Sequence, residues 1–95
     1  MVEIIWTRLA LHDWRQKHQY ISEDSVFYAD RFTLKLISRV GILEKHLFAG
    51  RVVPEKEDDT VGELIEGNYR IFYKIERKSK IFILRIHHGA KNISE

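Results

Sequence analysis

The residues of this sequence that could carry chemistry are basic and histidine side chains, most of them close to the C-terminal end. Histidine, with an unperturbed pKa of about 6.5, exchanges protons close to neutral pH. Arginine binds phosphate through two parallel hydrogen bonds. The set therefore suits phosphate binding and, in principle, RNA cleavage, which needs a general base, cations at the phosphate and a general acid. Its members are Arg70, Arg85, His87, His88 and Lys91, together with Arg51.

A structural role is the alternative for the two neighbouring histidines. Adjacent residues of a strand point to opposite faces of the sheet, so at least one of the pair, His88, is expected to be packed or to lie at an edge. The other histidines fall within predicted helices and are interpreted as surface or boundary residues. They are His12, His18 and His46.

Other catalytic and cofactor motifs are missing from the sequence. It contains no glycine-rich phosphate loop, HExxH motif or nucleophile elbow, and it has no cysteine for a disulfide or a thiolate metal site. We therefore expect no metal and no cofactor. The apolar runs are far shorter than the roughly 20 residues of a membrane-spanning helix, and the first six residues do not resemble a signal peptide. The sequence thus predicts a cytoplasmic protein without membrane contact.

Charge is distributed unevenly over the 95 residues, whose net charge is +2. Residues 51–68 contain two Lys or Arg and six Asp or Glu, whereas residues 69–95 contain seven and two. A solvated loop and a solvated strand edge would give this pattern. A cationic face that meets an acidic partner or a phosphate backbone would give it too, and the predicted strand register favours this second interpretation.

Hydropathy patterning predicts one α+β domain over residues 1–95, which begins with a strand and a helix. Apolar and mixed positions alternate over residues 2–6, as is typical of a strand. The apolar spacing then changes to three or four over residues 8–21, which predicts an amphipathic helix capped by Thr7. Ser22, followed by two acidic residues, is the predicted start of a second helix.

This second helix is predicted to continue to Leu47, because apolar residues keep the helical period that far. Gly41 is its weak point, since glycine costs up to about 1 kcal/mol relative to alanine within a helix, so a bend or break is expected there. Two helices with so short a connection should pack as an antiparallel hairpin. Residues 48–60 then break the helical pattern and are predicted to form a loop with a short strand at residues 51–53.

Three strands are predicted after this loop, at residues 61–66, 69–76 and 80–88. Gly67 and Asn68 form the predicted turn between the first two of them. The predicted fold class is therefore α+β with the order β-α-α-β-β-β, in which the N-terminal strand and the helical hairpin pack on a small antiparallel sheet.

The register of the last two strands decides which side chains share a face of the sheet. If Ile71 pairs with Ile86, one face is an apolar block for the helices to cover and the other face is basic. A slip by one residue would pair Ile71 with Arg85 and bury an unpaired guanidinium. The free-energy cost of that burial excludes the slipped register. The predicted apolar face contains Ile71, Tyr73, Ile75, Phe82, Leu84 and Ile86. The predicted open face contains Arg70, Phe72, Lys74, Ile83, Arg85 and His87.

Segments along nearly the whole chain match a known family in order and spacing. The first reads Trp6-Thr7-x-x-Ala10-x-x-Asp13-Trp14, with Tyr20-Ile21 after it, and the long helix is followed by Arg51-Val52-Val53-Pro54-Glu55. The strongest are Glu63-Leu64-Ile65, Asn68-Tyr69-Arg70-Ile71-x-Tyr73-x-Ile75 and Ile83-Leu84-Arg85-Ile86-His87-His88-Gly89-x-Lys91. The sequence resembles the RelE/ParE superfamily of toxins from bacterial toxin–antitoxin systems, which also contains plasmid stabilisation proteins.

The resemblance implies the fold predicted above and a cognate acidic antitoxin that forms a hetero-oligomer with the toxin. It leaves two targets open. RelE-like members cut messenger RNA in the ribosomal decoding site with basic residues and a terminal tyrosine or histidine, whereas ParE-like members poison DNA gyrase and are not nucleases. If this chain is a nuclease, the residues expected to be catalytic are His87, His88, Arg70 and Lys91.

The resemblance favours the ParE-like side. Arg70 matches the family's strand arginine and Lys91 its basic position after the last strand, but no tyrosine follows residue 73, so only a histidine could replace the RelE-like tyrosine. We therefore predict a growth-inhibiting toxin that poisons DNA gyrase and is not an enzyme. A ribosome-dependent mRNA endoribonuclease and an inactive interaction domain are the alternatives. The residues expected to contact phosphate or an acidic antitoxin segment are Arg51, Arg70, Phe72, Lys74, Arg85 and Lys91.

Overall fold

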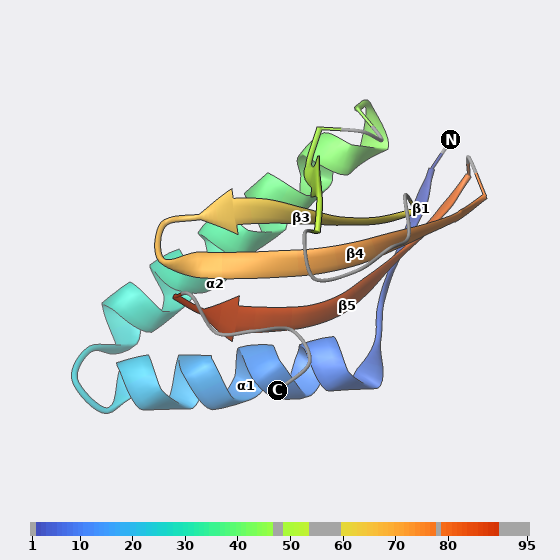
Figure 1. Ribbon diagram of the computed structural model, residues 1–95. Coiled ribbons are helices and arrows are strands. Elements are labelled where there is room, and N and C mark those ends of the chain that lie inside the picture. The colour runs from blue at the N-terminus through green and yellow to red at the C-terminus, as the bar shows by residue number, and fades with distance from the viewer. Residues whose placement is uncertain (1, 47–48, 54–59, 78, 90–95) are drawn as a thin grey trace.

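The computed structural model describes residues 2–46, 49–53, 60–77 and 79–89. It confirms the predicted α+β fold, with both helices on one face of the sheet (Figure 1). The strand order in the described part of the chain is β1-β5-β4-β3-β2, antiparallel except that β1 lies parallel to β5 at one edge. The elements are β1 (Glu3–Trp6), α1 (Arg8–Ser22), α2 (Val26–Gly41), the 3-10 helix η1 (Ile42–Glu44), β2 (Arg51–Val52), β3 (Val61–Glu66), β4 (Tyr69–Arg77) and β5 (Lys80–His88).

Two hydroxyl groups begin the helices. Thr7 caps α1 as predicted, and its Oγ1 also donates to the carbonyl oxygen of Ile83 at 2.7 Å, which fixes the start of the helix to β5. The cap of α2 is Ser25 and not Ser22, so the predicted start was wrong. The Ser22 hydroxyl instead donates to the carbonyl oxygen of Gln19 within the last turn of α1. A serine can serve either end of a helix, and only the local hydrogen bonds distinguish the two.

The helices pack as the predicted antiparallel hairpin. Trp14 Nε1 donates to Thr33 Oγ1 at 2.7 Å, and one turn further along α1 the His18 Nε2 atom lies 3.1 Å from Asp30 Oδ1. The α-helical part of α2 ends at Gly41, where the weak point was predicted, and the chain continues into η1. The predicted helix end at residue 47 lies outside the described residues.

The hydrophobic core fills the space between the hairpin and the sheet. Its members come from both helices, η1, β3, β4 and β5, so one contiguous cluster stabilises the two layers. Each large side chain contributes about 1.5–3 kcal/mol when fully buried. The buried residues of this cluster are Ala10, Phe32, Leu36, Val40, Leu43, Leu64, Ile71, Tyr73, Ile81, Ile83 and Ile86.

A β-bulge corrects the predicted register between β4 and β5. The predicted pairs form as far as Phe72, but the register then shifts, so that Tyr73 pairs with Ile83 instead of Leu84. An extra residue in one strand reverses the alternation of side chains beyond it. Ile81 and Ile83 therefore enter the main core, whereas Leu84 packs with Phe72 on the opposite face. The slipped register that we rejected for the whole hairpin thus occurs from Tyr73 to Ile75, where it buries no arginine. A second irregularity after Ile75 restores the predicted offset, with Arg77 opposite Lys80.

Candidate functional site

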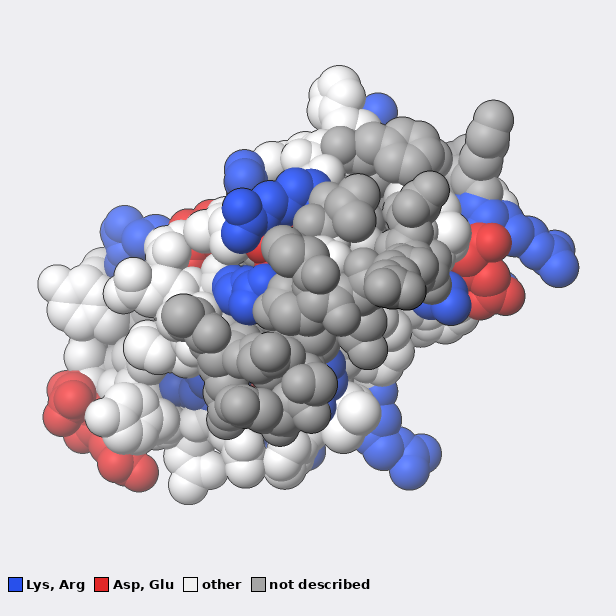
Figure 2. Space-filling view, in the orientation of Figure 1, with Lys and Arg blue, Asp and Glu red and all other residues white. Residues whose placement is uncertain are grey.

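The sheet face turned away from the helices carries the basic residues that the register predicted. Residues that pair across β2, β3, β4 and β5 form one row on this face, whose members are named below. Next to this row, Arg70 of β4 pairs with His87 of β5. Figure 2 shows Lys and Arg side chains on this side of the molecule. We call this surface the basic face. Its central row consists of Arg51, Glu63, Phe72 and Arg85.

Glu63 holds two of the arginines on the basic face. Its side chain is 0% exposed, and its two oxygens accept from different strands. Arg51 Nε lies 2.5 Å from Oε1, while Arg70 Nη2 lies 2.5 Å from Oε2 and Arg70 Nε donates to the same oxygen at 2.8 Å. Sheet geometry explains why both arginines reach Glu63. On β2, Arg51 is directly opposite Glu63, and on β4, Arg70 is the diagonal neighbour of Glu63. Sequence reasoning did not identify Glu63 as a partner of either arginine.

Phe72 is buried, which corrects the prediction of a ring open to a base or a protein partner. Its exposed fraction is 0%, the Arg70 guanidinium lies 4.8 Å from the ring centroid, and the His87 ring lies edge-on at 5.3 Å. The bulge explains this burial in part, since it turns Leu84 toward the same face. The second apolar cluster consists of Val53, Val61 and Phe72, with Leu84 packed against it.

Arg85 is bound by Asp13 of α1. Its Nε and Nη2 donate to the two Asp13 oxygens at 2.8 and 3.1 Å, and the amide of Ile86 donates to Oδ2 at 2.9 Å. Because β1 ends at Trp6, no described strand lies on this edge of β5, and the Asp13 carboxylate accepts from the Ile86 amide that a strand would otherwise bind. Burial raises the pKa of Asp13, but the hydrogen bonds from Arg85 and Ile86 outweigh it and hold this pKa below its ordinary value. The same bond with Asp13 raises the pKa of Arg85.

The two histidines lie on opposite faces, as expected. His88 ends β5, and its ring packs edge-on against Tyr69 at 5.1 Å, although the residue is exposed. His87, which was predicted to lie on the open face of the sheet, is only 3% exposed. Of the residues predicted for RNA cleavage, the structure therefore brings Arg70 and His87 together and leaves His88 apart, while Lys91 lies outside the described residues.

Two of the predicted binding residues keep exposed side chains on the basic face. Arg51 is 67% exposed although its Nε contacts Glu63, and Lys74 on β4 is also exposed. These side chains can meet an anionic partner without any rearrangement of the core.

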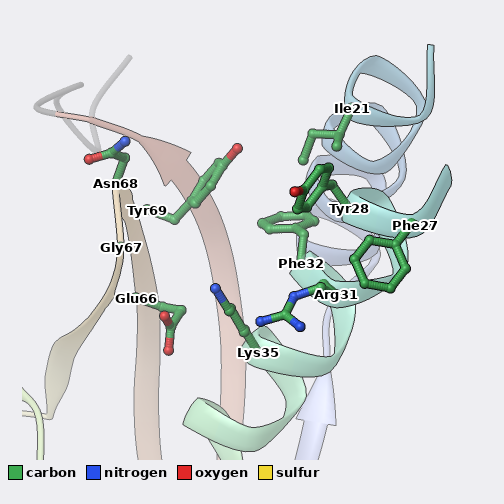
Figure 3. A pocket seen from close by; sticks show the side chains of 10 residues that line it. All are labelled: Ile21, Phe27, Tyr28, Arg31, Phe32, Lys35, Glu66, Gly67, Asn68 and Tyr69. Carbon is green, nitrogen blue, oxygen red and sulfur yellow. The ribbon is translucent and has the colours of Figure 1, made fainter. Parts of the chain in front are cut away.

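A groove between α2 and the β3–β4 turn was not predicted from the sequence. Figure 3 shows Arg31 and Lys35 reaching into it from α2, with Glu66 on the opposite side and Tyr69 facing Phe32. Its volume is about 470 Å³. The lining residues are Ile21, Phe27, Tyr28, Arg31, Phe32, Lys35, Glu66, Gly67, Asn68 and Tyr69.

The groove combines aromatic surface with cations. Phe27 and Tyr28 are 64% and 63% exposed. Among the described residues, no carboxylate lies within 4 Å of Arg31 or Lys35. Burial, and then the neighbouring Tyr20, raise the pKa of Tyr69, so its hydroxyl remains a hydrogen-bond donor at neutral pH. Exposed aromatic and arginine side chains are characteristic of protein-binding hot spots. The available signal was the adjacent aromatic pair Phe27 and Tyr28, which lies outside the helical stripe that enters the core.

Two other kinds of feature are absent from residues 2–46, 49–53, 60–77 and 79–89. No three His, Cys, Asp or Glu side chains in these ranges are grouped to hold a metal ion. Nor does any helix there have the length and apolar character needed to cross a membrane.

Comparison with known proteins decides the family of this chain. The family model described as "ParE toxin of type II toxin-antitoxin system, parDE" matches residues 4–93. The chain belongs to the ParE toxin family. The match extends over every candidate residue of the basic face and over Lys91. No curated protein matches this ParE-family chain significantly.

Two solved structures are similar to the ParE-family fold described here. The chromosomal ParDE toxin–antitoxin system from P. aeruginosa contains a chain with a TM-score of 0.75 and 23% identity, over 94% of this chain and 97% of that one. The toxin–antitoxin complex RelBE2 from Mycobacterium tuberculosis contains a chain with a TM-score of 0.60 and 23% identity, over 96% of this chain and 97% of that one. At this identity the similarity concerns the fold.

Proposed function

We propose that this ParE-family chain is the toxin of a type II toxin–antitoxin pair and that it arrests growth by binding DNA gyrase, not by cutting messenger RNA. Membership of the ParE family supports the first part. The state of the basic face carries the second part, because the groups that cleavage would use are engaged or buried. Arg51 and Arg70 bind Glu63, and His87 is 3% exposed.

RNA cleavage by general acid–base catalysis needs cations that contact the phosphate and a titrating group that reaches the 2′-hydroxyl. On the basic face, Arg70 is 12% exposed and its guanidinium is directed at a buried carboxylate. Arg85 likewise binds Asp13. A surface of this kind is suited to contact with a partner and not to turnover, which supports a toxin that acts by binding.

A cognate antitoxin is the second partner in this proposal. The two solved structures described above come from toxin–antitoxin systems, which supports an antitoxin partner for this chain. An acidic, partly disordered antitoxin segment suits the exposed cations of this chain. Arg31 and Lys35 in the groove are such cations, as are Arg51 and Lys74 on the basic face. We place the action of the pair in the cytoplasm, where gyrase acts.

Supercoiling by purified gyrase tests the proposal. The toxin is obtained by co-expression with its antitoxin and then separated from it, and relaxed plasmid, ATP and gyrase are incubated with rising amounts of toxin. We expect supercoiling to be inhibited, cleaved plasmid to accumulate, and equimolar antitoxin to reverse both effects. Unchanged supercoiling by folded toxin would refute gyrase as the target and would leave the ribonuclease or an inactive interaction domain.

A further inference from the structure

We infer that Glu63 is the residue that keeps phosphate groups off the basic face: its carboxylate fills the position between Arg51 and Arg70 that a phosphate oxyanion would otherwise occupy. This role of Glu63 specifies which ligands the basic face of the proposed toxin excludes, so its biological meaning rests on the proposed function. It concerns a defined chemical class of ligand, the tetrahedral oxyanion of a phosphate.

The contacts of Glu63 resemble those of an arginine-bound anion. Each of its oxygens accepts from a guanidinium of a different strand, at 2.5 Å from Arg51 Nε and at 2.5 and 2.8 Å from Arg70 Nη2 and Nε. Carboxylate and phosphate use the same planar arginine donors. A pair of arginines that converges on one point is therefore selective for an oxyanion, and in this chain the oxyanion is supplied internally.

Access to this position is limited to one side. The Arg51 side chain is 67% exposed, whereas the Arg70 side chain is 12% exposed and that of Glu63 is 0% exposed. An external anion would therefore approach along Arg51. With Glu63 in place the anion would meet a buried negative charge there, which opposes binding.

Substitution of Glu63 should convert the cluster into an anion site. Without the carboxylate, Arg51 and Arg70 face each other as like charges, and Arg70, whose side chain is 12% exposed, loses two of its charge-assisted hydrogen bonds, which is unfavourable. An oxyanion from solution relieves both costs. A purely structural role, in which Glu63 only holds β2 on β3, predicts lower stability for the variant but no preference for one anion over another.

Titration of the Glu63→Ala variant with inorganic phosphate distinguishes the two roles, because alanine leaves room between the guanidinium groups. We expect phosphate to bind the variant at least about tenfold more tightly than it binds wild type, measured as thermal stabilisation relative to chloride at equal ionic strength. Phosphate also stabilises proteins non-specifically. The double variant Glu63→Ala/Arg51→Gln controls for this, since it keeps the space and loses one cation, and its response should fall to the wild-type level.

Equal responses of wild type, Glu63→Ala and the double variant would overturn the inference. If Glu63→Ala does not fold even in phosphate, Glu63→Ser leaves similar room between the guanidinium groups and keeps a hydroxyl that can accept from one of them. The titration is then followed by the NMR signals of the Arg51 and Arg70 Nε–H groups, and their failure to shift with phosphate would equally overturn it. The purified chain alone is used, so this result is independent of the outcome with gyrase.

Discussion

At the scale of single residues, Asp13 connects α1 to β5 through one buried carboxylate. Asp13→Asn is expected to lower the free energy of unfolding by about 2 kcal/mol, because Arg85 loses its charged partner and the Ile86 amide a charged acceptor. Urea denaturation at neutral pH measures the change. Asp30→Asn is the matched control, since it removes an exposed carboxylate paired with His18, and it should change stability by less than about 1 kcal/mol. Equal effects of the two substitutions would contradict this account.

The same carboxylate predicts how stability depends on pH. The pKa of Asp13 in the folded chain lies below its ordinary value of 3.8, so the unfolded chain binds the proton more readily. The stabilisation is therefore fully present above pH 3.8 and is lost as pH falls through the lower pKa of the folded chain. Acid denaturation followed by circular dichroism should show a steeper loss of stability for wild type than for Asp13→Asn in this range. Parallel curves would refute the assignment.

The sequence identified the basic residues but not the carboxylates that bind them. Alternation along the strands was enough to place Arg70 and His87 opposite each other. The partner of Arg85 lies 72 positions away, and its contact depends on how α1 runs along β5, which no local pattern encodes. Glu63 was part of a matched motif, but its role appears only when β2 and β4 lie on both sides of it.

At the scale of the elements, replacing glycine by alanine is expected to have opposite effects on stability in β3 and at the end of α2. A Cβ at Gly62 in β3 would lie 2.6 Å from the Tyr73 ring, whereas a Cβ at Gly41, which has helical backbone angles, would meet nothing within 4 Å. We expect Gly62→Ala to lower the free energy of unfolding by about 1–3 kcal/mol and Gly41→Ala to raise it by about 0.5–1 kcal/mol. Thermal unfolding of both variants is the measurement. An unchanged thermal stability of Gly62→Ala would contradict this prediction and would show that the Tyr73 ring can move aside.

Element types and most strand boundaries followed from periodicity, because each strand is bounded by turn residues and each helix has one core stripe. The exceptions have physical causes. Register arithmetic assumes one residue opposite one residue, so it could not include the bulge that follows Phe72. The bulge depends on whether Ile83 or Leu84 fits the core better, and that choice is made by packing against the helices.

At the scale of the whole molecule, the groove of Figure 3 and the basic face offer two cationic surfaces to partners. If an acidic antitoxin segment uses the groove, Arg31→Glu/Lys35→Glu should weaken the toxin–antitoxin complex by about tenfold or more and reduce its salt dependence. Calorimetry at two salt concentrations is the measurement. Arg15→Glu/Lys45→Glu, which changes charge equally at exposed sites outside the groove, should have a smaller effect. If the two double variants bind equally, the groove is not the contact.

The central claim for the whole molecule is that the basic face does not cleave RNA. Primer extension on a translated messenger RNA, shortly after the chain is induced in bacteria without antitoxin, tests this claim most directly. Our account predicts growth arrest with intact messages. Codon-phased cuts that disappear when translation is blocked would contradict it, and would make Arg70, His87, His88 and Lys91 the catalytic candidates.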